Sequence, residues 1–213
     1  MVKKEKPQTG PEAPHNLEAN ARAYFKNAES FREKHQQRSM RECYEKALEL
    51  GRASETPDGL AIASEASLYL GHIAKTRQAW GLALERYEES LDLGRRSETP
   101  EGFYAAARAA WNLGNTLEEA GMEGLEEAFR EAILMGRDSK LPDALEVGAK
   151  AAFNLAVNIE PIEENTSDED IEKAADVWRA AIELGEASGT SDGTGVAKKA
   201  QQYLAELLER KNE

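Results

Sequence analysis

The chain has 213 residues, of which 40% are hydrophobic and 31% are charged, and its formal net charge at pH 7 is −13. A chain this acidic lacks the basic surface that nucleic-acid phosphates or an anionic membrane would attract, so we expect it to bind neither. Its sequence also contains no apolar stretch near the roughly 20 residues that a membrane-spanning helix requires.

Residues 1–15 are predicted to be a disordered tail. They are rich in lysine, proline and glycine, and they lack the apolar core of a secretion signal. Cys43 is the one cysteine of the chain, which excludes an intrachain disulfide. A cytoplasmic location is the simplest interpretation, and we expect no cofactor.

Residues 16–213 are predicted to form a single array of helices with short breaks. We expect helices at about 17–35, 38–53, 57–75, 78–96, 100–119, 124–137, 142–159, 168–188 and 193–211. These make four helix pairs, at about 17–53, 57–96, 100–139 and 142–188, and a capping helix at 193–211. The long break at 160–166 has the character of an insertion, and the acidic residues through 170 prolong it.

The clearest helix starts are Thr56-Pro57-Asp58 and Thr99-Pro100-Glu101. In each, a threonine hydroxyl caps the helix, proline stands where an N–H would have no partner, and a carboxylate lies near the positive helix end. Both triplets therefore predict the start of a first helix in a pair.

One pattern recurs four times along the chain: an aromatic residue followed seven positions later by glycine. The aromatic residues are Tyr44, Tyr87, Phe129 and Trp178, separated by steps of 43, 42 and 49 residues. A period of this size is typical of stacked helical units, each of which buries its apolar face only against its neighbours. It predicts an elongated all-α domain, because no unit can fold alone.

The four glycines of this pattern are Gly51, Gly94, Gly136 and Gly185. Glycine costs about 1 kcal/mol inside a helix, so its recurrence requires a reason. One interpretation is a close approach between helix backbones, and the other is a helix stop with positive φ. We favour the close approach, because the residues that follow each glycine still have a helical pattern.

Together these features resemble the tetratricopeptide repeat family. The resemblance rests on Leu70-Gly71 with Ala83 and Tyr87, on Leu113-Gly114 with Phe129 and Ala132, and on Leu155-Ala156 with Ala174 and Trp178. It implies a right-handed superhelical α-solenoid of helix-turn-helix repeats. The family period is about 34 residues, so the longer period here implies extended helices.

In that family the first helix of each pair lines the inner face, where partners bind. By this resemblance the candidate partner-binding residues are Leu68, His72, Lys75, Arg108, Trp111, Asn112, Asn115, Lys150, Phe153, Asn154, Val157 and Lys199. Arg108, Lys150 and Lys199 would form a basic row and Leu68, Trp111 and Phe153 an apolar row. The alternatives are that the cations are merely solvated and that the extended helices bury the rings.

We therefore expect a protein-interaction module that binds a peptide or helical segment of another protein on its concave face. Substitution of Trp111 by Ala would then abolish binding and leave the fold intact. The alternative is a self-associating scaffold, a homo-oligomer formed through the solenoid ends or the outer face. We expect no enzyme, since the sequence has no metal-ligand spacing and no glycine-rich phosphate loop.

Overall fold

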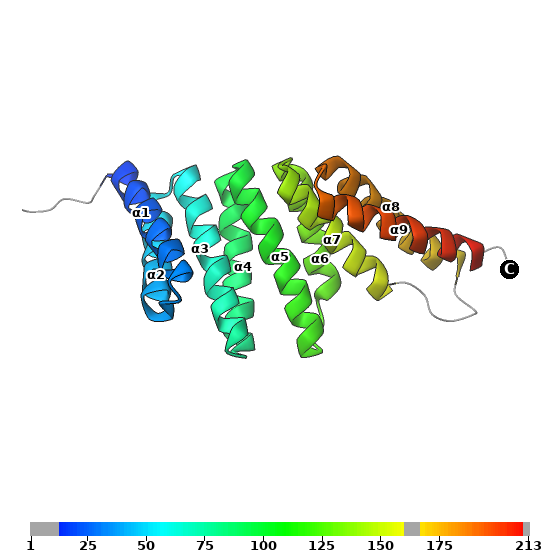
Figure 1. The fold of residues 1–213 in the computed structure, drawn as a ribbon, viewed down its shortest axis with the longest axis horizontal. Coiled ribbons are helices and arrows are strands. Elements are labelled where there is room, and N and C mark those ends of the chain that lie inside the picture. The colour runs from blue at the N-terminus through cyan, green and yellow to red at the C-terminus, as the bar shows by residue number, and fades with distance from the viewer. Residues whose placement is uncertain (1–12, 160–166, 211–213) are drawn as a thin grey trace, which may run out of the picture.

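The structure, a computed structural model, describes residues 13–159 and 167–210. Within them the chain forms helices and no strands (Figure 1). The helices are α1 (Pro14–Glu33), α2 (Gln37–Ser54), α3 (Pro57–Thr76), α4 (Trp80–Ser97), α5 (Pro100–Ala120), α6 (Leu125–Ser139), α7 (Pro142–Ile159), α8 (Asp168–Ser188) and α9 (Ser191–Arg210).

The helices stack in two rows, which confirms the predicted all-α repeat solenoid. Helices α1, α3, α5, α7 and α9 form one row, and α2, α4, α6 and α8 lie behind it (Figure 1). Neighbouring helices of the first row pack directly on each other, whereas neighbouring helices of the second row hardly touch. The first row is therefore the inside of the curve. We call the surface of α1, α3, α5, α7 and α9 on that side the first-helix face.

The predicted N-terminal caps are present at α3 and α5. The Thr56 hydroxyl accepts a hydrogen bond from the Gly59 amide, and the Thr99 hydroxyl accepts one from the Gly102 amide, each at 3.0 Å. Ser97 Oγ, at the end of α4, donates to the carbonyl oxygen of Gly94 in its own helix at 2.7 Å and lies 3.2 Å from Thr99 Oγ1, the cap of α5. The turns before α3, α5 and α9 are each fixed in this way by one serine and one threonine hydroxyl.

The recurring glycines lie inside their helices, as favoured from the sequence. Gly51 and Gly94 are buried within α2 and α4, and a β-carbon on Gly51 would stand 2.5 Å from the carbonyl oxygen of Gly59. The positive φ that stops these helices comes four residues later, at Glu55 (52°) and Glu98 (53°). Close backbone approach therefore explains the glycines, and acidic residues occupy the left-handed caps.

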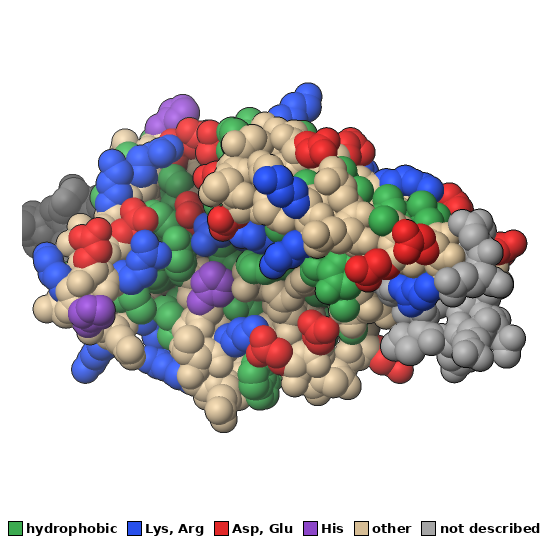
Figure 2. Space-filling view, turned by 45° about the vertical axis from the view of Figure 1, so that its right-hand side comes forward, with side chains coloured by type: hydrophobic (Ala, Val, Ile, Leu, Met, Phe, Trp, Pro, Cys, Tyr) green, Lys and Arg blue, Asp and Glu red, His purple; other side chains and the backbone are tan. Residues whose placement is uncertain are grey.

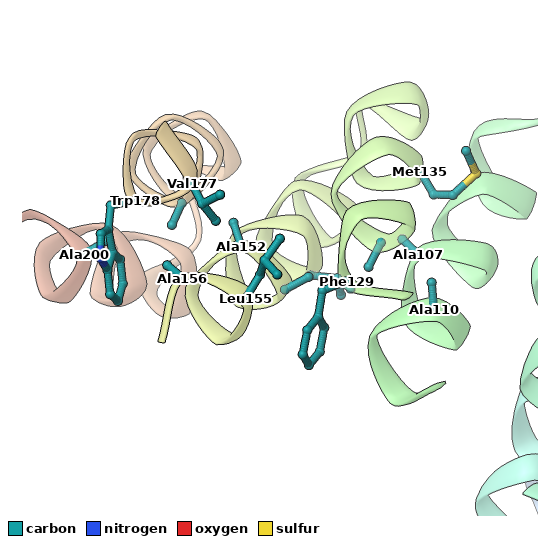
Figure 3. Close-up of a cluster of buried hydrophobic side chains, with 14 of the residues drawn as sticks. Ala107, Ala110, Phe129, Met135, Ala152, Leu155, Ala156, Val177, Trp178 and Ala200 are labelled. Atoms are coloured by element: carbon teal, nitrogen blue, oxygen red, sulfur yellow. The ribbon is translucent and has the colours of Figure 1, made fainter. Parts of the chain in front are cut away.

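The aromatic residues of the repeat fill the space inside and between units. Tyr44, Tyr87, Phe129 and Trp178 are all fully buried. Figure 3 shows Phe129 and Trp178 among small side chains such as Ala110, Ala152 and Ala156, which belong to one buried cluster. Alanine at these positions lets the helices approach closely enough to enclose the large rings.

The element boundaries differ from the sequence-based ones by a few residues. Helix α1 begins at Pro14, inside the segment 1–15 that was predicted as a tail, because proline is well tolerated at the first helical position. Residues 1–12 of that tail and the predicted insertion at 160–166 lie outside the described residues. Helix α6 runs two residues further than predicted, to Ser139.

Both ends of the array carry polar residues where a neighbouring helix would pack. In α3, Ser64 and Ser67 donate to carbonyl oxygens of α4, and the equivalent positions of α9 are the exposed Lys198 and Gln201. At the other end, Ala63 and Leu70 of α3 are buried, and their equivalents in α1 are the exposed Asn20 and Asn27. These outer surfaces favour water over another helix.

Candidate binding face

The first-helix face contains most, but not all, of the predicted partner-binding residues. Eight of them are partly accessible there: His72, Lys75, Arg108, Trp111, Asn112, Asn115, Lys150 and Asn154. Val157 and Lys199 are exposed. Leu68, by contrast, is fully buried in a cluster with Tyr87 and Leu113, so the expectation that it lines the groove is wrong. Its side chain lies between α3 and its neighbours.

The two predicted groove aromatics are largely core residues. Trp111 and Phe153 are partly buried and pack against the cluster that contains Phe129 and Trp178. Phe153 meets Trp178 edge to face at 5.0 Å between ring centroids. The Trp111 Nε1 atom is buried and has no hydrogen-bond partner within the described residues. The interpretation that extended helices bury these rings is the better one.

The predicted basic row is largely neutralised by neighbouring carboxylates. Arg108 pairs with Glu65 at 3.4 Å, and Lys150 pairs with Glu146 at 2.6 Å and with Asp192 at 3.6 Å. Glu65 occupies in α3 the place that Arg108 holds in α5, one period earlier. The row therefore begins with an acidic residue in α3, and the cations Arg108, Lys150 and Lys199 follow it in α5, α7 and α9.

Amide side chains cross-link the first helices of neighbouring units. Asn154 Nδ2 of α7 donates to Asn115 Oδ1 of α5 at 2.8 Å. Asn112 Nδ2 donates to the carbonyl oxygen of Arg108 in its own helix at 2.7 Å. These amides keep a polar strip along the middle of the face, although part of their hydrogen-bonding capacity is already used.

A ladder of alternating arginine and tyrosine side chains crosses α1, α3 and α5. The Arg32 guanidinium lies 4.9 Å from the centroid of the Tyr69 ring. Arg108 lies 5.5 Å from the same ring and 5.4 Å from that of Tyr104. We call Arg32, Tyr69, Arg108 and Tyr104 the Arg–Tyr ladder. Each guanidinium–ring contact contributes about 0.5–1 kcal/mol at a partly exposed site, and the stack holds the side chains in fixed positions.

Burial beside this ladder shifts the pKa of two ionisable groups. Burial raises the pKa of the Glu65 carboxyl, although Arg108 opposes the effect. Burial also lowers the pKa of His72 to about 4, and the positive charge of Arg108 adds to this change. His72 is therefore neutral at pH 7 and presents an uncharged imidazole, in edge-to-face contact with Tyr69 and Tyr87.

A cleft of about 320 Å³ opens between α1, α2 and the C-terminal half of α3. It is lined by Arg32, Gln37, Met40, Tyr44, Tyr69, His72, Ile73, Thr76 and Arg77. We call it the α1–α3 cleft. Figure 2 shows a hollow on this side of the molecule, with hydrophobic side chains in its floor and charged side chains around it. A second cleft, lined by His72, Lys75 and Trp80 among others, lies on the opposite side of α3.

The sequence pattern did not identify the ladder or the α1–α3 cleft. One signal was available: Arg32 lies one 43-residue period before Lys75, which was predicted on the inner face. Tyr69 is adjacent to Leu68, so a shift of one position along the helix separates a buried residue from an accessible one. The cleft itself depends on how far apart two units stand, which no local pattern specifies.

The described residues contain neither a cluster of metal-ligating side chains nor a membrane-spanning helix. No group of three or more His, Cys, Asp or Glu side chains there could hold a metal ion. None of the described helices is long and apolar enough to cross a lipid bilayer.

Comparison with known proteins finds distant structural likenesses and gives no indication of function. No protein-family model and no curated protein matches the chain. A de novo designed helical repeat protein, DHR64, is 19% identical over 92% of this chain and 96% of its own, with a TM-score of 0.34. The DHF58 filament is likewise 19% identical, over 92% and 96% of the two chains, with a TM-score of 0.37. Scores this low carry no argument about function, and membership of the tetratricopeptide family stays a prediction.

Proposed function

We propose that this chain is a protein-interaction module of tetratricopeptide type, which binds a peptide or a helix of another protein on its first-helix face. The observation that supports this function is the α1–α3 cleft beside the Arg–Tyr ladder. There, apolar and aromatic side chains line a hollow whose edge carries guanidinium groups.

The composition of this region is that of an interaction hot spot. Tyrosine and arginine are enriched at such sites, which combine a desolvated apolar pocket with a polar rim. The Tyr69 ring contacts the guanidinium groups of Arg32 and Arg108 and stacks on Tyr44, so it is already held before a partner arrives. A preorganised side chain saves part of the roughly 0.5–1.5 kcal/mol that immobilising it on binding would cost.

The alternative, self-association through the solenoid ends, has less support. The exposed Lys198 and Gln201 of α9, and Asn20 and Asn27 of α1, would have to be desolvated in a stacked pair of molecules. On the second-helix row, Leu82 and Leu134 are exposed on different helices, and single exposed leucines are ordinary surface features. A monomeric binder that uses its concave face fits these surfaces better.

The test is a selection of random displayed peptides on the immobilised protein. Enriched peptides are then measured against a first-helix-face variant, Arg32→Glu with Lys75→Glu. The matched control is Arg130→Glu with Arg137→Glu on α6, which makes the same charge change at exposed, ion-paired arginines. We expect at least tenfold weaker binding to the first variant and unchanged binding to the control. Failure to enrich any peptide, or equal losses in both variants, would refute the proposal.

A further inference from the structure

We propose that the α1–α3 cleft is an anion-selective subsite, which takes an aromatic or long aliphatic side chain of the bound segment together with an adjacent acidic side chain. This inference rests on the proposed function, since it states which chemistry the partner segment must present. It follows from the shape of the cleft, from the charge around it and from the availability of its two arginines.

The cleft has the size and the floor of a side-chain pocket. Its volume of about 320 Å³ lies at the lower end of the range for sites that enclose small ligands. Met40 and Ile73 supply flexible apolar surface, and Tyr69 supplies ring surface, backed by the buried ring of Tyr44, which stacks on it at 5.0 Å between centroids. Burial of an apolar group against this floor is favourable, whereas burial of a fully polar group would gain little free energy.

The charge of the cleft is opposite to that of the whole protein. The chain has 40 acidic and 27 basic residues, yet among the described residues two arginines and no carboxylate line this cleft. At the N-terminal ends of α3 and α5, another cleft of about 330 Å³ is lined by three carboxylates and one arginine: Asp58, Glu65, Glu101 and Arg22. Positive lining is therefore a local property of the α1–α3 cleft, and it is complementary to an anion.

Both arginines are available to a ligand. The Arg77 side chain is exposed and forms no ion pair within the described residues. Arg32 has its paired carboxylate, that of Glu29, only at 3.9 Å, and its guanidinium is already positioned over Tyr69. A carboxylate in the cleft would therefore gain charge-assisted hydrogen bonds without first displacing a short ion pair.

The same cleft is unfavourable for a cation. His72, whose pKa of about 4 leaves the imidazole neutral at pH 7, adds no charge to the lining. A cation would meet Arg32 and Arg77 with no lining carboxylate to balance them. We therefore expect the cleft to discriminate between ligands of the same shape and opposite charge.

Three probe molecules of matched shape test this discrimination: 3-phenylpropionate, 3-phenylpropionamide and 3-phenylpropylamine. They share a ring and a chain length and differ in charge. Methyl NMR spectra of the intact protein report binding at Met40 and Ile73. We expect the propionate to shift both methyl signals, the amide to bind at least about fivefold more weakly because it lacks charge-assisted hydrogen bonds, and the amine to bind most weakly.

Arginine variants then test whether this order of probe affinities arises in the α1–α3 cleft. Arg77→Gln and Arg32→Gln should each weaken the propionate about fivefold or more and leave the amide within twofold, whereas Arg130→Gln on α6 should change neither. A dispersed amide spectrum confirms that each variant is folded. Equal affinity for the three probes, insensitivity to Arg77→Gln, or methyl shifts confined to other residues would overturn the proposal. So would concentration-dependent shifts at Met40 and Ile73 without probe, which would indicate a second copy of the chain in the cleft.

The two proposals can fail separately. If selected peptides bind the first-helix face, lack acidic residues and ignore Arg77→Gln, the subsite is refuted and the interaction module stands. If the probes follow the expected order and no peptide is enriched, the cleft prefers anions but the peptide-binding function is refuted.

Discussion

Gly94 of α4 and Gly102 of α5 approach so closely that a β-carbon on Gly94 would lie 2.4 Å from the Gly102 carbonyl oxygen. The same relation joins Gly185 of α8 to Gly193 of α9, also at 2.4 Å. This backbone contact sets the spacing between a second helix and the next first helix. It repeats along the array and so positions the first-helix face.

Substitution of Gly94 by Ala should destabilise the protein by about 1–3 kcal/mol. Helix propensity alone would give a gain of about 1 kcal/mol. The new β-carbon, however, meets a backbone carbonyl that cannot rotate away, and overpacking of this kind costs more than the propensity gains. Chemical denaturation followed by circular dichroism measures the difference.

Gly195→Ala is the matched control for that experiment. Gly195 is also helical, in α9, but no atom lies within 4 Å of the position that its β-carbon would take. The same substitution should therefore stabilise the protein by about 0.5–1 kcal/mol. A variant at Gly94 as stable as the one at Gly195 would contradict the assignment of a tight helix contact.

Glu98→Gly should stabilise the protein by up to about 1 kcal/mol. Glu98 ends α4 with φ at 53°, a left-handed conformation that costs a residue with a β-carbon roughly 1–2 kcal/mol. A glycine at this position would remove the strain from the folded state. Its greater conformational freedom in the unfolded chain would offset part of that stabilisation. The reverse change, Gly189→Ala at φ 65°, should destabilise the protein, and thermal melts of both variants measure the pair. Shifts of the same sign would argue against left-handed strain.

Trp111→Ala should cost about 3 kcal/mol of stability, contrary to the expectation from sequence that it leaves the fold intact. The indole packs against the main buried cluster, and its Nε1 atom is buried. Truncation of a buried aromatic leaves a cavity that the neighbouring helices fill only in part. A melting temperature within 2 °C of the wild type would show instead that the ring belongs to the surface. Lys75→Glu is the better probe of the first-helix face, because Lys75 pairs with Glu119 near the surface.

The period of the sequence predicted the fold well because each unit repeats the same local requirements. In one unit, Tyr87 supplies the buried ring, Gly94 allows the close contact between helices, and Thr99-Pro100 caps and starts the next helix. All three are satisfied within a unit and its neighbour. A repeat of this kind therefore determines the architecture with little information from the rest of the chain.

The residues of the first-helix face were harder to predict than the fold, because a single step along a helix turns the side-chain direction by about 100°. Leu68 was placed in the groove and is buried, whereas Tyr69 was overlooked and stacks with two arginines. The Arg–Tyr ladder needs side chains from three units at a set separation. That separation results from the glycine contacts between helices, which no pattern within one helix expresses.

The last prediction concerns pH. The pKa of His72 is lowered to about 4 in the folded protein, first by burial and then by Arg108, with smaller effects of Lys75 and Arg32 and an opposing one of Asn112. In the unfolded chain a histidine titrates near 6.5. Between these values the unfolded state binds a proton that the folded state does not, so His72 reduces stability as the pH falls from about 6.5 to about 4.

The wild type should therefore lose about 2–3 kcal/mol more than His72→Gln between pH 7.5 and pH 4. Other ionisable groups also contribute to each curve, so the comparison is made between variants and not from one curve. His35→Gln removes an exposed histidine and should follow the wild type. Denaturation curves at several pH values give the slope of the unfolding free energy against pH for the wild type, His72→Gln and His35→Gln. Parallel curves for the wild type and His72→Gln would mean that His72 is hydrated, and that the wall it forms between the two clefts of α3 is open to water.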